Sequence, residues 1–225
     1  MRITLIQNDP KWLGVDENLA WIESQIELHK GSHLYLLPEM FNTAYIMDPK
    51  QGAEQINGKT IETMKSWASK FSCIVGGSIP MQHETKYTNS FIFVGQEGVV
   101  STYDKVHLFT PAGEAESYFP GQKRSFVTIG SSKILPLICY DLRFPYISYN
   151  NDAEVYDILI YAANWPTARI HHWRQLLIAR AIENQAYCIG LNRVGHDENG
   201  FLYPGSSMAV DYSGKILIEL GEDAS

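Results

Sequence analysis

The chain has 225 residues, of which 45% are hydrophobic and 19% charged, enough apolar material to bury one sizeable core. Its formal net charge is −7, and no run of Lys or Arg offsets it, which argues against DNA or RNA as a partner. The N-terminal apolar run is too short for a signal peptide, and no apolar stretch reaches the roughly 20 residues that cross a bilayer.

Strands and helices alternate in the first third of the chain. Short apolar runs predict strands over residues 2–7, 33–38 and 73–79. Apolar residues at helical spacing predict two helices, one through Leu19, Ile22 and Ile26 and one through Ile61, Met64 and Ala68. Gly31 lies where the first helix must stop, and Thr60 is the expected N-cap of the second.

The rest of the chain predicts hairpins, two further strands and one long helix. Hairpins are expected over 89–105, 125–141 and 206–220, strands over 157–165 and 188–195, and a helix over 171–187. Because no linker or charge block divides the sequence, we expect one α/β domain over residues 1–225. The order of elements favours two sheets packed face to face with helices outside.

Three cysteines are present, an odd number without a CxxC pair, which favours free thiols in a reducing compartment, the cytoplasm. Cys73 and Cys188 lie inside apolar strands and are expected to be core residues. Cys139 ends a strand and is followed by the polar stretch YDLRFP, so its thiol can face a cleft as a nucleophile. The histidines and cysteines are not grouped as metal ligands, so no metal site is expected.

Two other charged residues stand at the ends of predicted strands. Lys105 interrupts the apolar run around VVSTYDKVHLF, and a cation beside a thiol lowers its pKa and can stabilise an oxyanion. Its parity on the strand places it on the same side as His107. Glu39 follows LYLLP and precedes Met and Phe, surroundings that suit a carboxylate engaged in proton transfer. Taken singly, Lys105 is better explained as an exposed residue of an edge strand, whereas the apolar neighbours of Glu39 argue against an exposed loop position.

The amino-acid sequences of three segments resemble those of the nitrilase superfamily of carbon–nitrogen hydrolases. The segments are LLPEMF, YDKVHLF and ICYDLRFP, and further similar stretches are AANWP, ARAIENQAY, GLNRVG and YPGSSMAVD. The likeness runs from residue 2 to about residue 220 and is nearest to bacterial omega-amidases, which hydrolyse the terminal amide of 2-oxoglutaramate.

The resemblance implies a four-layer α-β-β-α sandwich and a catalytic triad of Glu39, Lys105 and Cys139. It also implies a supporting glutamate, which matches Glu114 in GEAESYFPG, although Glu116 lies close by. The expected reaction is hydrolysis of a small amide through a Cys thioester, without a cofactor. The residues expected to bind substrate are Tyr140 through its backbone N–H, Asn164 and Trp165 as a pocket wall, and Arg143 and Arg169 as cations for a substrate carboxylate.

Two further expectations come from the family. The resemblance implies a homodimer. Members of the family join subunits through a C-terminal segment, whereas this sequence stops at GEDAS, so we expect that segment to be short or truncated. The alternatives to an omega-amidase are a nitrilase with the same triad, a Cys–His amidohydrolase that uses His107 or His171 as base, and a silent binding protein on the same scaffold.

Overall fold

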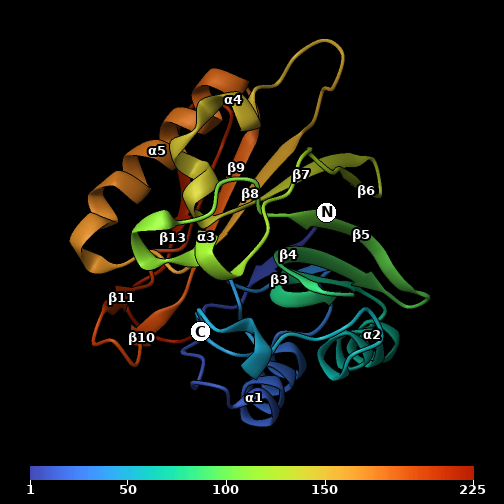
Figure 1. Cartoon of the computed structure of the whole chain (residues 1–225). Helices are drawn as coiled ribbons and strands as arrows, with labels where there is room; N and C mark the ends of the chain where they lie inside the picture. Colours follow the sequence, from blue (N-terminus) through green and yellow to red (C-terminus); the bar gives the residue numbers. More distant parts are fainter.

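A computed structural model describes residues 1–225 and contains two β-sheets packed face to face (Figure 1). The five-stranded sheet has the order β1-β2-β3-β4-β5, formed by Ile3–Leu5, Leu34–Leu36, Ile74–His83, Lys86–Gly95 and Gly98–Asp104. The six-stranded sheet has the order β13-β12-β9-β8-β7-β6, formed by Ile216–Glu219, Met208–Val210, Tyr187–Asn192, Ile158–Ala163, Ser132–Ile138 and Val127–Ile129. Parallel pairs lie at β1–β2–β3 and β7–β8–β9, and the other pairs are antiparallel.

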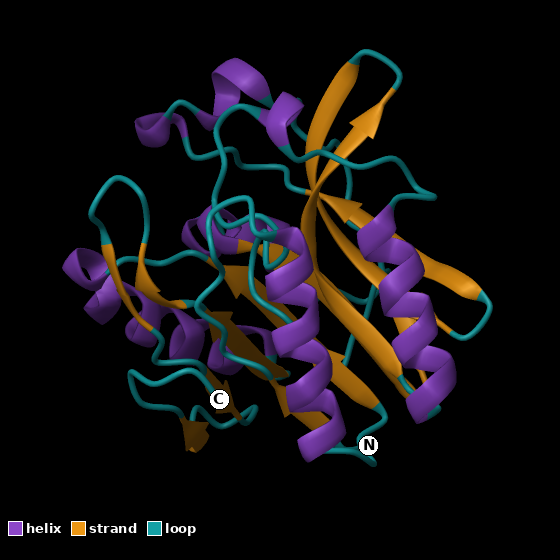
Figure 2. Ribbon diagram, turned by 90° about the horizontal axis from the view of Figure 1, so that it is seen from below, coloured by secondary structure: helices purple, strands orange, loops and turns teal.

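Helices cover the outer faces of both sheets. Helices α1 (Val15–Leu28) and α2 (Lys59–Phe71) lie on the five-stranded sheet, in front of its strands in Figure 2. Helix α5 (Ile170–Asn184) covers the six-stranded sheet. The expected α-β-β-α layering is therefore confirmed. None of these helices is long and apolar enough to span a membrane.

The alternation of side chains along β4 shows how one strand serves two cores. Phe91 and Phe93 point towards the six-stranded sheet, into a core of 31 buried residues that also extends under α5. Ile92 and Val94 point the opposite way, into the core of 16 buried residues shared with α1 and α2. Because successive strand residues face opposite sides, a strand buried on both faces is a continuous apolar run, as residues 91–94 are.

Short segments join the strands around the edge where the site lies. They are the 3₁₀ turns η1 (Pro49–Gln51), η2 (Thr110–Ala112), η3 (Cys139–Arg143) and η4 (Thr167–Arg169), and the short helices α3 (Glu114–Ser117) and α4 (Pro145–Ser148). A separate two-stranded hairpin is formed by β10 (Val194–His196) and β11 (Leu202–Pro204).

Two predictions about elements were wrong. Thr60 is not the N-cap of α2, because Gly58 takes that position and the Glu54 carboxylate accepts the Thr60 N–H at 2.7 Å. The predicted strand over 188–195 is two strands in different sheets, interrupted at Arg193. The Arg193 side chain is buried and donates to Asp9 at 2.8 Å, a tertiary contact that holds the chain where it leaves the large sheet.

The predicted bounds were otherwise close. Helix α5 ends three residues earlier than expected, because Gln185 adopts the left-handed conformation with φ 49°. Strands β3 and β4 extend beyond the predicted 73–79 and 89–105, and they meet at a turn after His83. Strand β7 ends at Ile138, so that Cys139 is the first residue of η3.

Candidate active site

Polar residues from both sheets meet where several strands end. Glu39 follows β2, Lys105 follows β5, Cys139 follows β7 and Asn164 follows β8. Strands β7 and β8 are parallel, so their carboxyl ends lie at the same edge of the six-stranded sheet. Glu39 and Lys105 stand at strand ends of the facing five-stranded sheet, so each of the four side chains has a rigid support.

A buried ion cluster brings together Glu39, Lys105 and Glu114, whose side chains are all 0% exposed. The Lys105 Nζ lies 2.7 Å from Glu39 Oε1 and 2.8 Å from Glu114 Oε2. Burial alone lowers the pKa of Lys105, but attraction by Glu114 and Glu39 outweighs it and raises this pKa above its ordinary value. Lys105 is therefore a permanent cation in this site.

Glu114, rather than Glu116, is the glutamate that joins the cluster. Glu114 begins α3 and accepts hydrogen bonds from the Phe109 N–H at 2.6 Å and the Tyr45 hydroxyl at 3.2 Å. Glu116 is exposed on the same short helix. Burial, followed by the charges of Glu114 and Glu39, raises the pKa of Tyr45 well above its usual range, so Tyr45 stays a hydroxyl donor.

Asn164 holds the second oxygen of Glu39. The backbone N–H of Asn164 donates to Glu39 Oε2 at 2.9 Å, and its side-chain amide donates to Oε2 at 3.2 Å and to the Glu39 carbonyl at 2.9 Å. The two residues are 125 positions apart in sequence. Asn164, expected as a pocket wall, lines the cavity and also ties the two sheets together at Glu39.

Cys139 has a strained backbone, with φ +43°, at the junction of β7 and η3. A left-handed conformation at a residue other than Gly costs about 1–3 kcal/mol and is retained at functional sites such as nucleophile elbows. The Sγ atom lies 3.8 Å from the Asn164 carbonyl. Burial, followed by the Glu39 charge, raises the pKa of the Cys139 thiol well above its usual range, although Lys105 lowers it.

The resting thiol is therefore neutral. The expected effect of Lys105 on the thiol pKa has the right sign, but it is smaller than the effect of burial. A base must remove the proton before the sulfur can attack, and Glu39 is the carboxylate whose charge acts most strongly on Cys139.

Asp141 closes the turn that carries Cys139, a role that the sequence reading missed. Its carboxylate accepts hydrogen bonds from the Ile138 N–H at 3.0 Å, the Tyr103 hydroxyl at 2.7 Å and the His107 N–H at 3.0 Å. An Asp two residues after a strand-end Cys is a sequence signal for such a turn.

The two histidines considered as alternative bases contact other groups. His107 Nδ1 lies 2.7 Å from Asp141 Oδ1, and its Nε2 contacts the Tyr146 hydroxyl. The expected strand parity of His107 with Lys105 fails, because β5 ends at Asp104 and the two side chains reach different carboxylates. His171 is exposed near the start of α5.

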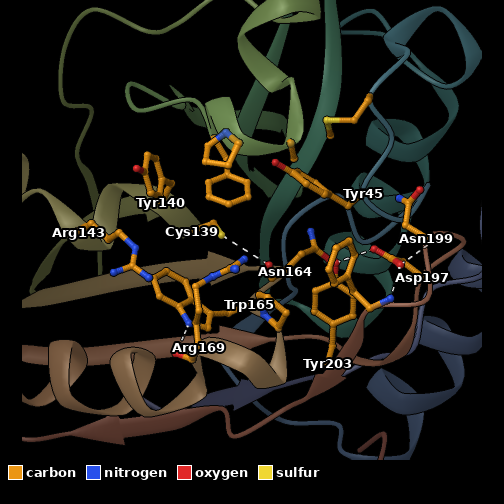
Figure 3. A pocket seen from close by; sticks show the side chains of 16 residues that line it. Tyr45, Cys139, Tyr140, Arg143, Asn164, Trp165, Arg169, Asp197, Asn199 and Tyr203 are labelled. Atoms are coloured by element: carbon orange, nitrogen blue, oxygen red, sulfur yellow. Dashed lines mark hydrogen bonds between the residues drawn. The ribbon is translucent and has the colours of Figure 1, made fainter.

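Cys139 opens into a cavity of about 410 Å³ (Figure 3). All five residues expected to bind substrate line this cavity: Tyr140, Arg143, Asn164, Trp165 and Arg169. The Arg143 guanidinium lies 4.9 Å from the centre of the Trp165 ring and donates to His172 at 3.1 Å. The Arg169 guanidinium lies 5.4 Å from the centre of the Phe109 ring. Neither guanidinium is paired with a carboxylate.

The opposite wall comes from the β10–β11 hairpin and the segment before η1, neither of which the sequence reading assigned to the site. Its lining residues are Tyr45, Met47, Asp197, Asn199, Phe201 and Tyr203. The Asp197 carboxylate accepts from the Tyr203 hydroxyl at 2.8 Å and so holds the hairpin together. The Asn199–Gly200 pair, with Gly200 at φ +79°, was the sequence signal that could have revealed this hairpin.

Comparison with known proteins identifies a single family. Residues 2–225 match the family model described as carbon–nitrogen hydrolase. The chain is 40% identical over 216 residues to the omega-amidase YafV of Yersinia enterocolitica, covering 96% of this chain and 83% of that protein. It is 30% identical over 225 residues to the 2-oxoglutaramate amidase of Bacillus subtilis, covering 98% of this chain and 86% of the relative.

Solved structures show the same architecture. XC1258 from Xanthomonas campestris superposes with a TM-score of 0.95 at 32% identity, covering 100% of this chain and 88% of that one. It is described as a CN-hydrolase superfamily protein with an arsenic adduct in its active site.

Proposed function

The chain belongs to the carbon–nitrogen hydrolase family of the nitrilase superfamily, and from this premise we propose that it hydrolyses a small ω-amide, with 2-oxoglutaramate as the leading substrate. The products are a carboxylate and ammonia. The observation that carries the proposal is the buried cluster of Glu39, Lys105 and Glu114 beside the Cys139 thiol, at a cavity lined by two arginines.

In the first half of the reaction, Glu39 takes the thiol proton and the Cys139 sulfur attacks the amide carbon. The negative charge that develops on the carbonyl oxygen is stabilised by Lys105 and by the backbone N–H of Tyr140, and one such donor contributes about 3–4 kcal/mol. Protonated Glu39 then gives its proton to the leaving nitrogen, so that ammonia departs and a thioester remains.

In the second half, Glu39 removes a proton from water, which attacks the thioester carbon. Collapse of this intermediate breaks the C–S bond, releases the acid, and returns the proton to the sulfur. Glu114 supports the site by holding Lys105, and its hydrogen bond from Tyr45 keeps it fixed. Because the resting thiol is neutral, Glu39 must accept its proton before the sulfur can attack.

The substrate carboxylate is assigned to Arg143 and Arg169. Both guanidinium groups stack on aromatic rings and lack a carboxylate partner, which leaves them able to bind an anionic end group. A charged substrate end held there would direct its amide towards Cys139. This arrangement offsets the overall negative charge of the protein, which by itself repels an anion.

Arg143→Met and Arg169→Met are each expected to lower kcat/KM for 2-oxoglutaramate by roughly 10- to 100-fold, the effect of losing a charge-assisted hydrogen bond. The value for a neutral amide such as butyramide should change little. Arg174→Met is the matched control, because Arg174 lies outside the cavity and pairs with Glu219. Ammonia release measures all of these rates. If the unmodified protein hydrolyses butyramide as well as 2-oxoglutaramate, the proposed carboxylate site is wrong and only an unspecified amidase remains.

A homodimer located in the cytoplasm completes the proposal. The three cysteines are free, which agrees with a reducing compartment. Light scattering of the purified chain over a range of concentrations tests the dimer, and a constant monomer mass would overturn it.

A further inference from the structure

The buried ion cluster contains more negative than positive charge. Glu39 and Glu114 are both carboxylates, Lys105 is the single cation between them, and all three side chains are fully buried. With both carboxylates ionised, one formal negative charge is left on side chains that are fully buried. Burying such a charge is costly unless further hydrogen-bond donors compensate for it.

Asn89 supplies the missing donors. Its Nδ2 donates to Glu39 Oε1 at 2.8 Å and to Glu114 Oε1 at 3.0 Å, so each of its two N–H groups serves one carboxylate. Lys105 Nζ contacts the same two oxygens at 2.7 and 3.0 Å. The two carboxylates are thus bridged twice, once by an ammonium and once by a neutral amide.

The backbone places Asn89 and Lys105 side by side. Asn89 lies in the middle of β4, and its carbonyl accepts the Lys105 N–H at 2.9 Å where β5 has just ended. Neighbouring side chains on paired strands rise on the same face of the sheet. The amide and the ammonium therefore reach the carboxylates from adjacent positions on one rigid support.

Ser78 determines which way the Asn89 amide points. The Ser78 hydroxyl donates to Asn89 Oδ1 at 2.9 Å and itself accepts the Met40 N–H at 3.0 Å. With the Asn89 oxygen taken by this hydroxyl, the NH₂ group must face Glu39 and Glu114. The opposite orientation would set an oxygen against two carboxylate oxygens. Met40 follows Glu39 directly, so Ser78 also fixes the segment that carries the base.

We propose that Asn89, oriented by Ser78, is a positioning residue that keeps Glu39 and Glu114 ionised and at a fixed separation. This inference rests on the proposed role of Glu39 as the base. The titratable groups that face Glu39 are Lys105 from the end of β5, Glu114 from α3, Tyr118 directly after α3, Cys139 from η3 and Tyr45 from the segment before η1. None of these other groups is a neutral amide that can donate to both carboxylates.

Asn89→Leu removes both donors while keeping the size of the side chain. Donors to a carboxylate favour its charged form, so their loss favours the protonated form. The acidic limb of the pH profile of kcat/KM is therefore expected to move to higher pH by about one unit, with most of the activity regained above the limb. A purely structural role would lower activity by the same factor at every pH and leave the limb where it was.

Two variants provide the comparison. Thr88→Val is an equally isosteric change at the neighbouring position of β4, where Thr88 bonds Ser90 and His83 but neither carboxylate, and it should leave the limb unmoved. Ser78→Ala keeps every atom of Asn89 but releases its amide, and a smaller shift in the same direction is expected. If Asn89→Leu fails to fold, Ser78→Ala carries the test alone.

The rate of Cys139 alkylation by iodoacetamide, measured against pH, separates this inference from the proposed function. Alkylation needs the thiol proton to pass to Glu39 but needs no amide substrate. A shifted alkylation limb in Asn89→Leu supports the positioning role even if no amide is hydrolysed. An unshifted limb in both Asn89→Leu and Ser78→Ala overturns that role, even if the protein proves to be an active amidase.

Discussion

Replacement of Cys139 by alanine is expected to abolish amide hydrolysis, lowering kcat on the order of 10⁶-fold, the scale seen when a nucleophile is removed. The reason is that Cys139 is the one cysteine that opens into the cavity. Alanine keeps the Cβ atom, so the backbone strain at φ +43° and the fold should be unchanged. Ammonia release measures the loss, and circular dichroism with thermal unfolding checks the fold.

Cys73→Ala and Cys188→Ala are the matched controls, and both should keep most of the activity. Burial raises the pKa of Cys73 to about 11, and it raises the pKa of Cys188 as well. The carboxylate that acts on Cys188 is Glu183, which is paired with Arg180 at 2.7 Å. Iodoacetamide, followed by mass spectrometry, should therefore label Cys139 first. Faster labelling of Cys73 with retained activity after modification of Cys139 would contradict the assignment.

Lys105→Met is expected to lower turnover by several orders of magnitude and to raise the pKa of the Cys139 thiol further. Lys105 is the charged group that lowers this pKa, and its ammonium is also assigned to the oxyanion. Removing it leaves two buried carboxylates without a cation, which should destabilise the fold by about 3–5 kcal/mol. The pH dependence of iodoacetamide labelling reports the thiol, and urea unfolding reports the stability.

A second substitution separates the two effects of Lys105→Met. Adding Glu114→Gln removes one of the uncompensated carboxylates, so the double variant should recover much of the stability but none of the turnover. If Lys105→Met alone keeps most of its turnover, the triad is wrong, and His107, paired with Asp141, becomes the base to test.

Local sequence was enough to predict the strand ends at which Glu39, Lys105 and Cys139 stand. Glu39, Lys105 and Cys139 each interrupt or close an apolar run, and in the structure each follows the last residue of a strand. The predicted hairpins and the helices between them also lie close to their observed positions. The resemblance of three segments to one family then predicted that these residues act as a set.

The contacts of Asn89 could not be predicted from local sequence. In the sequence it is an ordinary polar residue near the start of a predicted hairpin, and nothing in NSFIFV distinguishes it from Ser90 beside it. Strand alternation sends Asn89 towards Glu39 and Glu114 and sends Ser90 to the opposite face. The face that meets the carboxylates is decided by how the sheet is packed, not by the residue type.

The sequence by itself determined most of the elements and the polar residues that stand at their ends, because these depend on neighbours along the chain. Only the tertiary structure decided which of them meet, such as Glu39 with Asn164 across 125 positions. It also placed the β10–β11 hairpin as one wall of the cavity. It also decided that the Cys139 thiol is neutral at rest. That state is the balance of burial, Glu39 and Lys105, and such a balance depends on distances in space that no local pattern contains.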